Sequence, residues 1–123
     1  MCEIFISAPP QSYECRTRSV RLHGVVTSIR LENLYWEVLG EIGQRDGMSV
    51  AQLLERLYDE LVGQRGEVGN FASFLRVTAL RYLALQARGL IPTDLNVPIG
   101  SLDPRQVLDR LPESWARRDP VPH

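Results

Sequence analysis

The chain has 123 residues, of which 44% are hydrophobic and 24% are charged, and its formal net charge is −1. This length predicts a single small domain with tails, and the composition is that of an ordinary globular protein. No apolar run reaches the roughly 18–20 residues of a membrane-spanning helix, and the first residues lack the basic start of a secretory signal. We therefore expect a cytoplasmic protein and exclude a membrane protein, a secreted protein and a wholly disordered chain.

The positive charges are concentrated in one short block. All 14 basic residues are arginine, and residues 15–31 carry four of them with no acid. Residues 32–67, which follow, carry eight acids and three arginines. Arginine binds phosphate oxygens and guanine edges through two parallel hydrogen bonds. The basic block is therefore a candidate nucleic-acid contact, and a solvated strand end is the alternative.

The cysteines and histidines predict neither a disulfide nor a metal site. The two cysteines are Cys2 and Cys15, and the two histidines are His23 and His123. No pair among them has the spacing of zinc ligands, and a reducing compartment keeps both thiols free. We therefore expect no metal and no cofactor.

The N-terminal third predicts an arm and one strand. Residues 1–17 contain Pro9-Pro10 and no clear period, which indicates an arm with a short strand at residues 4–6. From Val20 to Leu31 the spacing is that of an extended segment rich in β-branched residues. Gly24 interrupts it and is interpreted as a bulge. The last part alternates cleanly, with Thr27, Ile29 and Leu31 on one face and Val26, Ser28 and Arg30 on the other.

Two amphipathic helices follow the strand. The first covers residues 33–45 and ends at Asp46-Gly47, because glycine tolerates the left-handed conformation of a helix C-terminus. The second covers residues 50–62. Ser49 and Gln52 have the spacing of a capping box at its start.

A third helix and a proline-rich arm complete the chain. Asn70 caps a helix over residues 71–88, which is apolar most of the way round and therefore expects partners on more than one side. Residues 90–123 contain six of the eight prolines and one short helix, capped by Asp103 and ending near Leu111. Trp115 in this arm either packs on the chain's own helices or anchors a partner. The expected regions are thus an arm (1–17), a domain (18–89) and a C-terminal arm (90–123).

The order of elements predicts a mostly α-helical fold with one N-terminal β-strand. A lone strand leaves backbone N–H and C=O groups unpaired, and the same strand of a second copy satisfies them. The two-fold symmetry of a homodimer then gives a two-stranded antiparallel ribbon. Dimerisation also supplies burial that so small a core lacks.

The central stretch resembles the ribbon-helix-helix (MetJ/Arc-like) DNA-binding family. The resemblance runs without a gap from Val26 to about Leu61. It rests on Thr27-Ser28-Ile29-Arg30-Leu31-Glu32, the helix over residues 33–45, the turn Asp46-Gly47-Met48-Ser49-Val50 and the helix over residues 50–62. A bacterial subfamily with an added third helix is also similar, through the aromatic Trp36 and the run Ser73-Phe74-Leu75-Arg76.

The resemblance implies an intertwined homodimer whose ribbon lies in the major groove of double-stranded DNA. It implies a sequence-specific, repressor-like transcriptional regulator with base contacts from Val26, Ser28 and Arg30. The backbone N–H groups of Met48, Ser49 and Val50 would hold a phosphate. The implied dimer core is Ile29, Leu31, Leu39, Ile42, Leu53, Leu57 and Phe74. The third helix leaves a dimer or a higher oligomer open.

One departure from the subfamily concerns Val26, which stands where a basic residue is usual. Valine contacts only a thymine methyl group, so a base contact through two hydrogen bonds is lost. We expect Arg16, Arg18 and Arg21 to compensate through phosphate contacts, because backbone contacts supply much of the affinity for DNA.

Two other classes of protein are alternatives to DNA binding. A dimeric adaptor or antitoxin-like protein would bind a protein partner through residues 90–123, with Trp115, Arg117 and Arg118 as contacts. Met1-Cys2 resembles the start of N-terminal-cysteine amidotransferases, but Glu3 stands where those enzymes carry glycine. No His or Asp motif supports Cys2 as a nucleophile, so we expect no enzyme. The glycines at 63, 66 and 69 lack the Lys-Ser/Thr ending of a phosphate loop.

Overall fold

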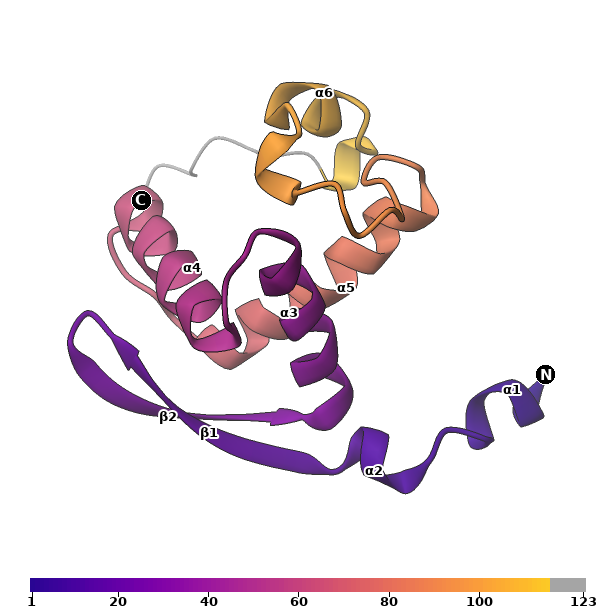
Figure 1. Cartoon of the computed structure of the whole chain (residues 1–123), viewed down its shortest axis with the longest axis horizontal. Helices are drawn as coiled ribbons and strands as arrows, with labels where there is room; N and C mark the ends of the chain where they lie inside the picture. The colour runs from indigo at the N-terminus through magenta and orange to yellow at the C-terminus, as the bar shows by residue number, and fades with distance from the viewer. Residues whose placement is uncertain (116–123) are drawn as a thin grey trace.

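The computed structural model describes residues 1–115. A two-stranded hairpin lies along one side of the molecule, three long helices cover one of its faces, and two short helices extend from the end opposite its turn (Figure 1). The elements in chain order are α1 (Cys2–Ile6), α2 (Pro10–Tyr13), β1 (Cys15–Leu22), β2 (Val25–Glu32), α3 (Asn33–Arg45), α4 (Val50–Arg65), α5 (Phe71–Ala87), the 3-10 helix η1 (Ile99–Ser101), α6 (Pro104–Asp109) and the 3-10 helix η2 (Glu113–Trp115).

The antiparallel ribbon is present, but both of its strands come from one chain. β1 pairs with β2 in a register that places Ser19 opposite Ser28. His23 and Gly24 connect the strands with φ values of 49° and 78°. Two positive φ values are what a two-residue type I′ hairpin turn requires. The expectation of a lone strand with a bulge at Gly24 is therefore wrong, because Gly24 lies in the turn that connects two antiparallel strands.

The two faces of the hairpin differ in burial. Val20 and Leu22 of β1, and Ile29 and Leu31 of β2, are buried against the helices. The residues between them along each strand face away from the helices and are exposed or partly exposed. The predicted alternation over residues 26–31 is confirmed, since side chains on successive strand residues point to opposite faces.

The helices α3 and α4 begin and end for local reasons that the sequence predicted. α3 ends before Gly47, whose φ is 71°. At the start of α4, the Ser49 Oγ accepts from the Gln52 N–H at 3.1 Å, and the Gln52 Oε1 accepts from the Ser49 N–H at 2.8 Å. α4 extends to Arg65, three residues beyond the predicted end. Its apolar side continues through Leu61 and Val62, which are half-buried.

The helix α5 buries one side and exposes another. The Asn70 Oδ1 caps its start by accepting from the Ser73 N–H at 3.1 Å. Four of its residues are buried: Leu75, Ala79, Tyr82 and Leu85. A second set of large apolar side chains is exposed to solvent: Val77, Leu80 and Leu83.

The core lies within the single chain, between the hairpin and the three long helices. Five of the seven residues expected in a dimer core are buried in it: Ile29, Leu31, Leu39, Ile42 and Leu53. The other two, Leu57 and Phe74, pack against it and are half-buried. These side chains stabilise the fold of one chain, because burying apolar area from water is the main favourable contribution to folding.

The described part of the C-terminal arm packs on the helices. The Arg45 side chain, only 6% exposed, donates to the backbone carbonyls of Asp94 and Val97 at 3.0 Å each. The carboxylate of Asp46 accepts from the N–H groups of Ile99 and Gly100. The short helix predicted after Asp103 is present as α6.

Trp115 lies at the end of the described arm and is half-buried against the core. The Arg88 guanidinium lies 4.7 Å from the centre of the Trp115 ring. The Trp115 backbone carbonyl accepts a hydrogen bond from the Arg81 Nη1 at 3.4 Å. The arrangement favours packing on the chain's own helices. Arg117 and Arg118, the other expected partner contacts, lie outside the described residues.

The N-terminal arm is helical where a short strand was expected. Residues 4–6 lie in α1, so the expected strand is wrong. Their side chains are exposed, so no packing partner imposes an extended conformation on them. α2 follows and begins at Pro10, whose fixed φ suits the first position of a helix.

Candidate nucleic-acid interface

The hairpin face that points away from the helices, here called the outer face, is the candidate site. It contains the three residues predicted to contact bases, and all three are exposed: Val26, Ser28 and Arg30. The register places three exposed residues of β1 directly opposite them: Arg21, Ser19 and Thr17. Residues opposite each other in an antiparallel pair share a face, so the six side chains form one surface. That surface has two guanidinium groups, three hydroxyl groups and no acid.

Arg21 lies directly opposite Val26 on the outer face. A basic residue is therefore present beside Val26, although it comes from the neighbouring strand. The Arg21 Nη1 donates to the Gly24 carbonyl at a long distance of 3.4 Å. An arginine side chain has five donors, and the others of this exposed guanidinium have no hydrogen-bond partner among residues 1–115, so they can bind a ligand.

Arg16 and Arg18 do not lie on the outer face. They alternate with Thr17 and Ser19 along β1, so their side chains point toward the helix side of the hairpin. The Arg18 guanidinium lies 5.5 Å from the centre of the Trp36 ring, and the Trp36 Nε1 donates to the Arg16 carbonyl at 2.9 Å. The structure therefore brings one of the three predicted phosphate-binding arginines, Arg21, together with the base-contact residues.

The nearest acid on β2, Glu32, is held by an arginine of α5. The Arg76 Nε donates to the Glu32 Oε1 at 3.0 Å. A hydrogen bond from the Glu32 backbone N–H and the hydrogen bond from Arg76 lower the pKa of this carboxyl. Both stabilise the charged form. The negative charge of Glu32 is thereby neutralised by Arg76 at the end of the strand.

The start of α4 offers fewer free donors than predicted. The Met48 N–H donates to the Gly43 carbonyl at 2.8 Å, and the Ser49 N–H donates to the Gln52 side chain. The expectation that these two groups are free for phosphate is therefore wrong, because the turn and the capping box use them. Val50, the first residue of α4, forms no such backbone contact in the part of the chain that the structure describes.

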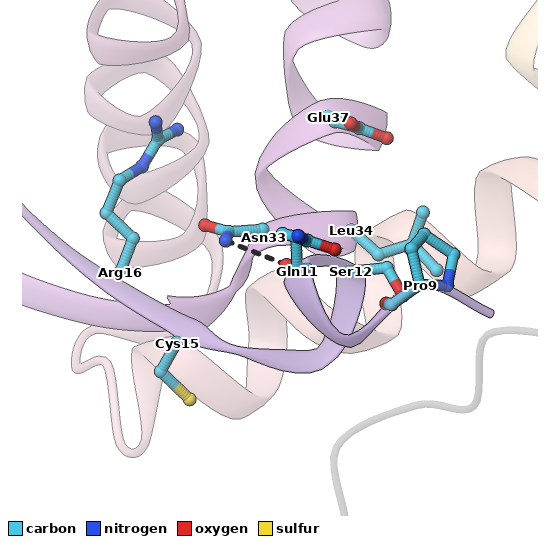
Figure 2. A pocket seen from close by; sticks show the side chains of 8 residues that line it. All are labelled: Pro9, Gln11, Ser12, Cys15, Arg16, Asn33, Leu34 and Glu37. Carbon is cyan, nitrogen blue, oxygen red and sulfur yellow. Dashed lines mark hydrogen bonds between the residues drawn. The ribbon is translucent and has the colours of Figure 1, made fainter.

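A separate hollow of about 660 Å³ lies where α2 and the start of β1 meet α3 (Figure 2). The Asn33 Nδ2 donates to the Gln11 carbonyl at 2.9 Å, and the Asn33 N–H donates to the Glu14 carbonyl at 2.8 Å. Arg16 and Glu37 line its rim. The two Asn33 hydrogen bonds fix the N-terminal arm to α3. The side chains that line the hollow include no hydrogen-bonded pair of an acid and a base that could transfer a proton.

Two further properties bear on what the described residues can do. Within residues 1–115, no group of three or more His, Cys, Asp or Glu side chains is placed to hold a metal ion. No helix in that range is both long enough and apolar enough to cross a membrane. The outer face remains the surface with a defined chemistry, which is hydrogen-bond donation to acceptors by arginine and hydroxyl groups.

Sequence reasoning missed the β1 half of the outer face. The sequence pattern puts Thr17 in the arm and leaves Ser19 outside the predicted strand, because the run before Val20 lacks apolar alternation. It puts Arg21 in the same single strand as Arg30 and not on a second strand opposite it. The one signal that could have found these positions is Gly24 between two extended runs, since glycine favours the positive φ of a two-residue hairpin turn. His23-Gly24 is a weak form of it, because the usual pairs are Asn-Gly, Asp-Gly and Gly-Gly.

Comparisons with known proteins agree with this geometry. A family model described as the ribbon-helix-helix domain matches residues 15–83. The chain is similar over 99% of its length to the solved structure of an uncharacterized protein from Bordetella pertussis Tohama I, at 60% identity, with 98% of that chain covered and a TM-score of 0.93. Comparison with curated proteins found no match. The family match takes in both strands of the hairpin and the three long helices except the last turn of α5, and from it we conclude that the chain belongs to the ribbon-helix-helix family.

Proposed function

We propose that this protein is a sequence-specific DNA-binding regulator of transcription that acts as a repressor in the cytoplasm. The observation that carries the proposal is the outer face, where exposed arginine and serine side chains lie together without an acid. Membership of a family whose domains are typically DNA-binding supports it. No cofactor is part of the proposal.

The outer face has the size and chemistry to bind in the major groove. A two-stranded ribbon fits the groove, which is about 12 Å wide. Arg30 can donate two hydrogen bonds to guanine O6 and N7, and the Ser28 hydroxyl can donate or accept at a base edge. Val26 contributes an apolar contact with a thymine methyl group. Each bidentate pair contributes about 1–3 kcal/mol of discrimination against the wrong base.

Phosphate contacts hold the ribbon in register on the duplex. The proposal keeps the N–H of Val50, which has no backbone partner in the part of the chain that the structure describes, as one such contact at the positive end of the α4 dipole. It leaves out Arg16 and Arg18, because their side chains lie on the helix side of the hairpin. Binding should weaken as salt is raised, since phosphate contacts release counterions.

The proposed active form is a homodimer joined through α5. The pairing of β1 with β2 removes the lone strand as a reason for dimerisation. A different reason is the set of exposed apolar side chains on α5, Val77, Leu80 and Leu83, because monomers rarely expose adjoining apolar groups without use. DNA-binding dimers recognise two half-sites, so the operator should have two-fold symmetry.

Sedimentation equilibrium tests the dimer. The wild-type protein should have twice the 14.0 kDa mass of one chain, and Leu80→Glu should have the mass of a single chain. Leu108→Glu is the matched control, because Leu108 is an exposed leucine on α6 rather than α5. A monomeric wild type, or a Leu80→Glu protein that stays dimeric, would remove α5 as the interface.

Retention of fragmented genomic DNA, followed by sequencing, tests the function. The wild-type protein should enrich a few sites with two-fold symmetry at moderate salt, and Arg30→Ala should lose them. Arg105→Ala, which removes the same charge from an exposed position on α6, should enrich the same sites as wild type. If the wild type enriches nothing, or Arg30→Ala retains the same fragments, the proposal is wrong.

A further inference from the structure

The two strands of the hairpin carry the same short sequence. Residues 19–22 are Ser-Val-Arg-Leu, and residues 28–31 are Ser-Ile-Arg-Leu. Valine and isoleucine are both β-branched, so the two segments have the same order of hydroxyl, branched apolar, guanidinium and leucine side chains. The repeat has a period of nine residues.

The register of the hairpin relates these copies by a local two-fold axis. Ser19 and Ser28 are directly opposite each other. In an antiparallel pair, an axis through one such pair carries each residue of one strand onto the residue at the same distance along the other. Arg21 is therefore carried onto Arg30, two residues beyond the axis on each strand.

The equivalent positions have equivalent surroundings. Val20 and Ile29 face the helices with 4% and 5% exposure, and Leu22 and Leu31 with 4% and 0%. Ser19, Ser28, Arg21 and Arg30 are all exposed on the outer face. The symmetry therefore holds for the two buried pairs and for the Ser and Arg pairs that a ligand would contact. It breaks at the outer pair in which Thr17 corresponds to Val26, and at the helix-side pair in which Arg18 corresponds to Thr27.

We infer that β1 is a second base-reading strand, and that Arg21 and Ser19 contact bases as Arg30 and Ser28 do. Both strands of the two-fold ribbon then come from one chain. Two chains would otherwise be needed, each contributing one strand. This inference rests on the proposed function, and it assigns to Arg21 a base contact in place of the phosphate contact expected from the sequence.

The geometry of the strands sets what such a ribbon would recognise. Arg21 and Arg30 lie on neighbouring strands and are separated along the ribbon by four residue steps, or about 13–14 Å. This separation spans a few base pairs. Because the local axis reverses strand direction, the two guanidinium groups should contact guanines on opposite strands of the duplex. The DNA sequence bound by one hairpin should thus be a short inverted repeat. Its symmetry should be weaker at the bases that face Thr17 and Val26, because these two equivalent positions carry different side chains.

Selection from a random duplex pool tests the inference with the full chain. The proteins compared are wild type, Arg30→Ala, Arg21→Ala and Arg21→Lys. Arg16→Ala serves as the control, because it removes the same charge from β1 but on the helix side. Thermal unfolding confirms that each variant is folded. Lysine keeps the charge for a phosphate but lacks the planar fork that binds guanine through two hydrogen bonds.

A base-reading Arg21 gives a position-specific result. Arg21→Ala and Arg21→Lys should both relax the preference at one base position and its symmetry mates, and Arg30→Ala should relax a different set. The loss of discrimination at each should be about 5- to 150-fold, which corresponds to about 1–3 kcal/mol. Arg16→Ala should leave every base preference unchanged.

Other results overturn the inference, and they separate it from the proposed function. If Arg21→Ala lowers binding equally for all sequences and Arg21→Lys restores it, Arg21 is a phosphate contact. If Arg21→Ala changes nothing while Arg30→Ala relaxes its position, β2 alone reads bases. In both cases the inference fails and the proposed function stands. If the wild type selects no sequence, or Arg30→Ala selects the same sites, the proposed function itself fails.

Discussion

At the scale of single residues, Glu32 shows how an acid beside a DNA-binding surface is controlled. Its carboxylate is held by Arg76, and the Arg76 guanidinium also lies 6.0 Å from the centre of the Tyr35 ring. The contact joins the end of β2 to α5 and keeps a negative charge paired. It therefore has both a structural and an electrostatic consequence.

The lowered pKa of Glu32 predicts how stability depends on pH. A carboxyl with a lowered pKa in the folded state stabilises the fold above its unfolded pKa, and this contribution is lost as pH falls through the folded pKa. Glu32→Gln should lower the free energy of unfolding near neutral pH by about 0.2–1 kcal/mol, because the ion pair is about one-third exposed and partly screened. The difference from wild type should shrink at acid pH.

Urea unfolding at pH 7 and at pH 3 measures this effect. Glu37→Gln is the control, since Glu37 is an exposed acid on α3 without a hydrogen-bond or salt-bridge partner among the described residues. A Glu32→Gln protein as stable as wild type at pH 7, or one whose deficit persists unchanged at pH 3, would contradict the assignment.

Replacing either of two glycines of α3 by alanine should change the stability of the fold, in opposite directions. A Cβ at Gly43 would lie 2.8 Å from the Met48 carbonyl oxygen, whereas a Cβ at Gly40 would lie 3.6 Å from a Val50 methyl group. Gly43→Ala should destabilise the fold by about 1–3 kcal/mol, because a backbone atom cannot move aside cheaply. Gly40→Ala should stabilise it by about 0.5–1 kcal/mol through helix propensity. Denaturant midpoints of the two variants test the close approach, and an equal response at both positions would be evidence against it.

At the scale of elements, the hairpin turn is the part that makes the outer face. His23 and Gly24 both adopt positive φ, and a Cβ added at Gly24 would meet no atom within 4 Å. Gly24→Ala should therefore destabilise the fold by about 1–2 kcal/mol, through backbone strain and not through a clash. Gly69→Ala, at an open position without positive φ, should change stability much less. Thermal melts compare them, and an equal loss at both would show that the turn is not under this constraint.

The sequence predicted the long helices well and the hairpin poorly, for a physical reason. Helix ends depend on local capping, such as the Ser49–Gln52 box, and helix faces depend on a stripe within one segment. β1 has buried apolar residues at only two positions, Val20 and Leu22. Before them, the helix-facing position 18 is an arginine stacked over Trp36, which no alternation of apolar and polar residues can reveal.

The sequence predicted the β2 side of the outer face and missed the β1 side. Ser28 and Arg30 follow from the alternation within β2, because strand faces are set by sequence alone. Arg21 could not be placed on the same face without the strand register, and the register depends on where the turn lies. The loss of Met48 and Ser49 as donors depends on contacts across the turn, which the sequence does not specify.

At the scale of the whole molecule, Arg45 connects the C-terminal arm to the helices. It donates to two arm carbonyls and to the Tyr82 hydroxyl, which in turn donates to the Glu41 carboxylate at 2.6 Å. Burial and the hydrogen bond with Glu41 raise the pKa of Tyr82. Its neutral hydroxyl therefore stays in place up to alkaline pH, and the connection is maintained.

Limited proteolysis measures the packing of the arm. Residues 90–115 should resist cleavage in wild type, because their buried contacts hold the arm on the helices. Arg45→Met should open the arm to cleavage and lower the free energy of unfolding by about 3 kcal/mol, since the Asp94 and Val97 carbonyls and the buried Tyr82 hydroxyl lose their donor. Arg105→Met, an exposed change on α6, is the control. Rapid cleavage of the wild-type arm would instead favour the adaptor interpretation, in which this segment orders on a protein partner.

The most direct test of DNA recognition is the ratio of two dissociation constants, one for a retained duplex and one for the same duplex with its sequence scrambled. Both should be measured at the same salt concentration, because binding to phosphates changes with salt. Wild type should bind the retained duplex about 1,000-fold or more tightly than the scrambled one. Arg30→Ala should reduce that ratio by about 5- to 150-fold while affecting the scrambled duplex little. A ratio near one for wild type, or an unchanged ratio for Arg30→Ala, would contradict sequence recognition by the outer face.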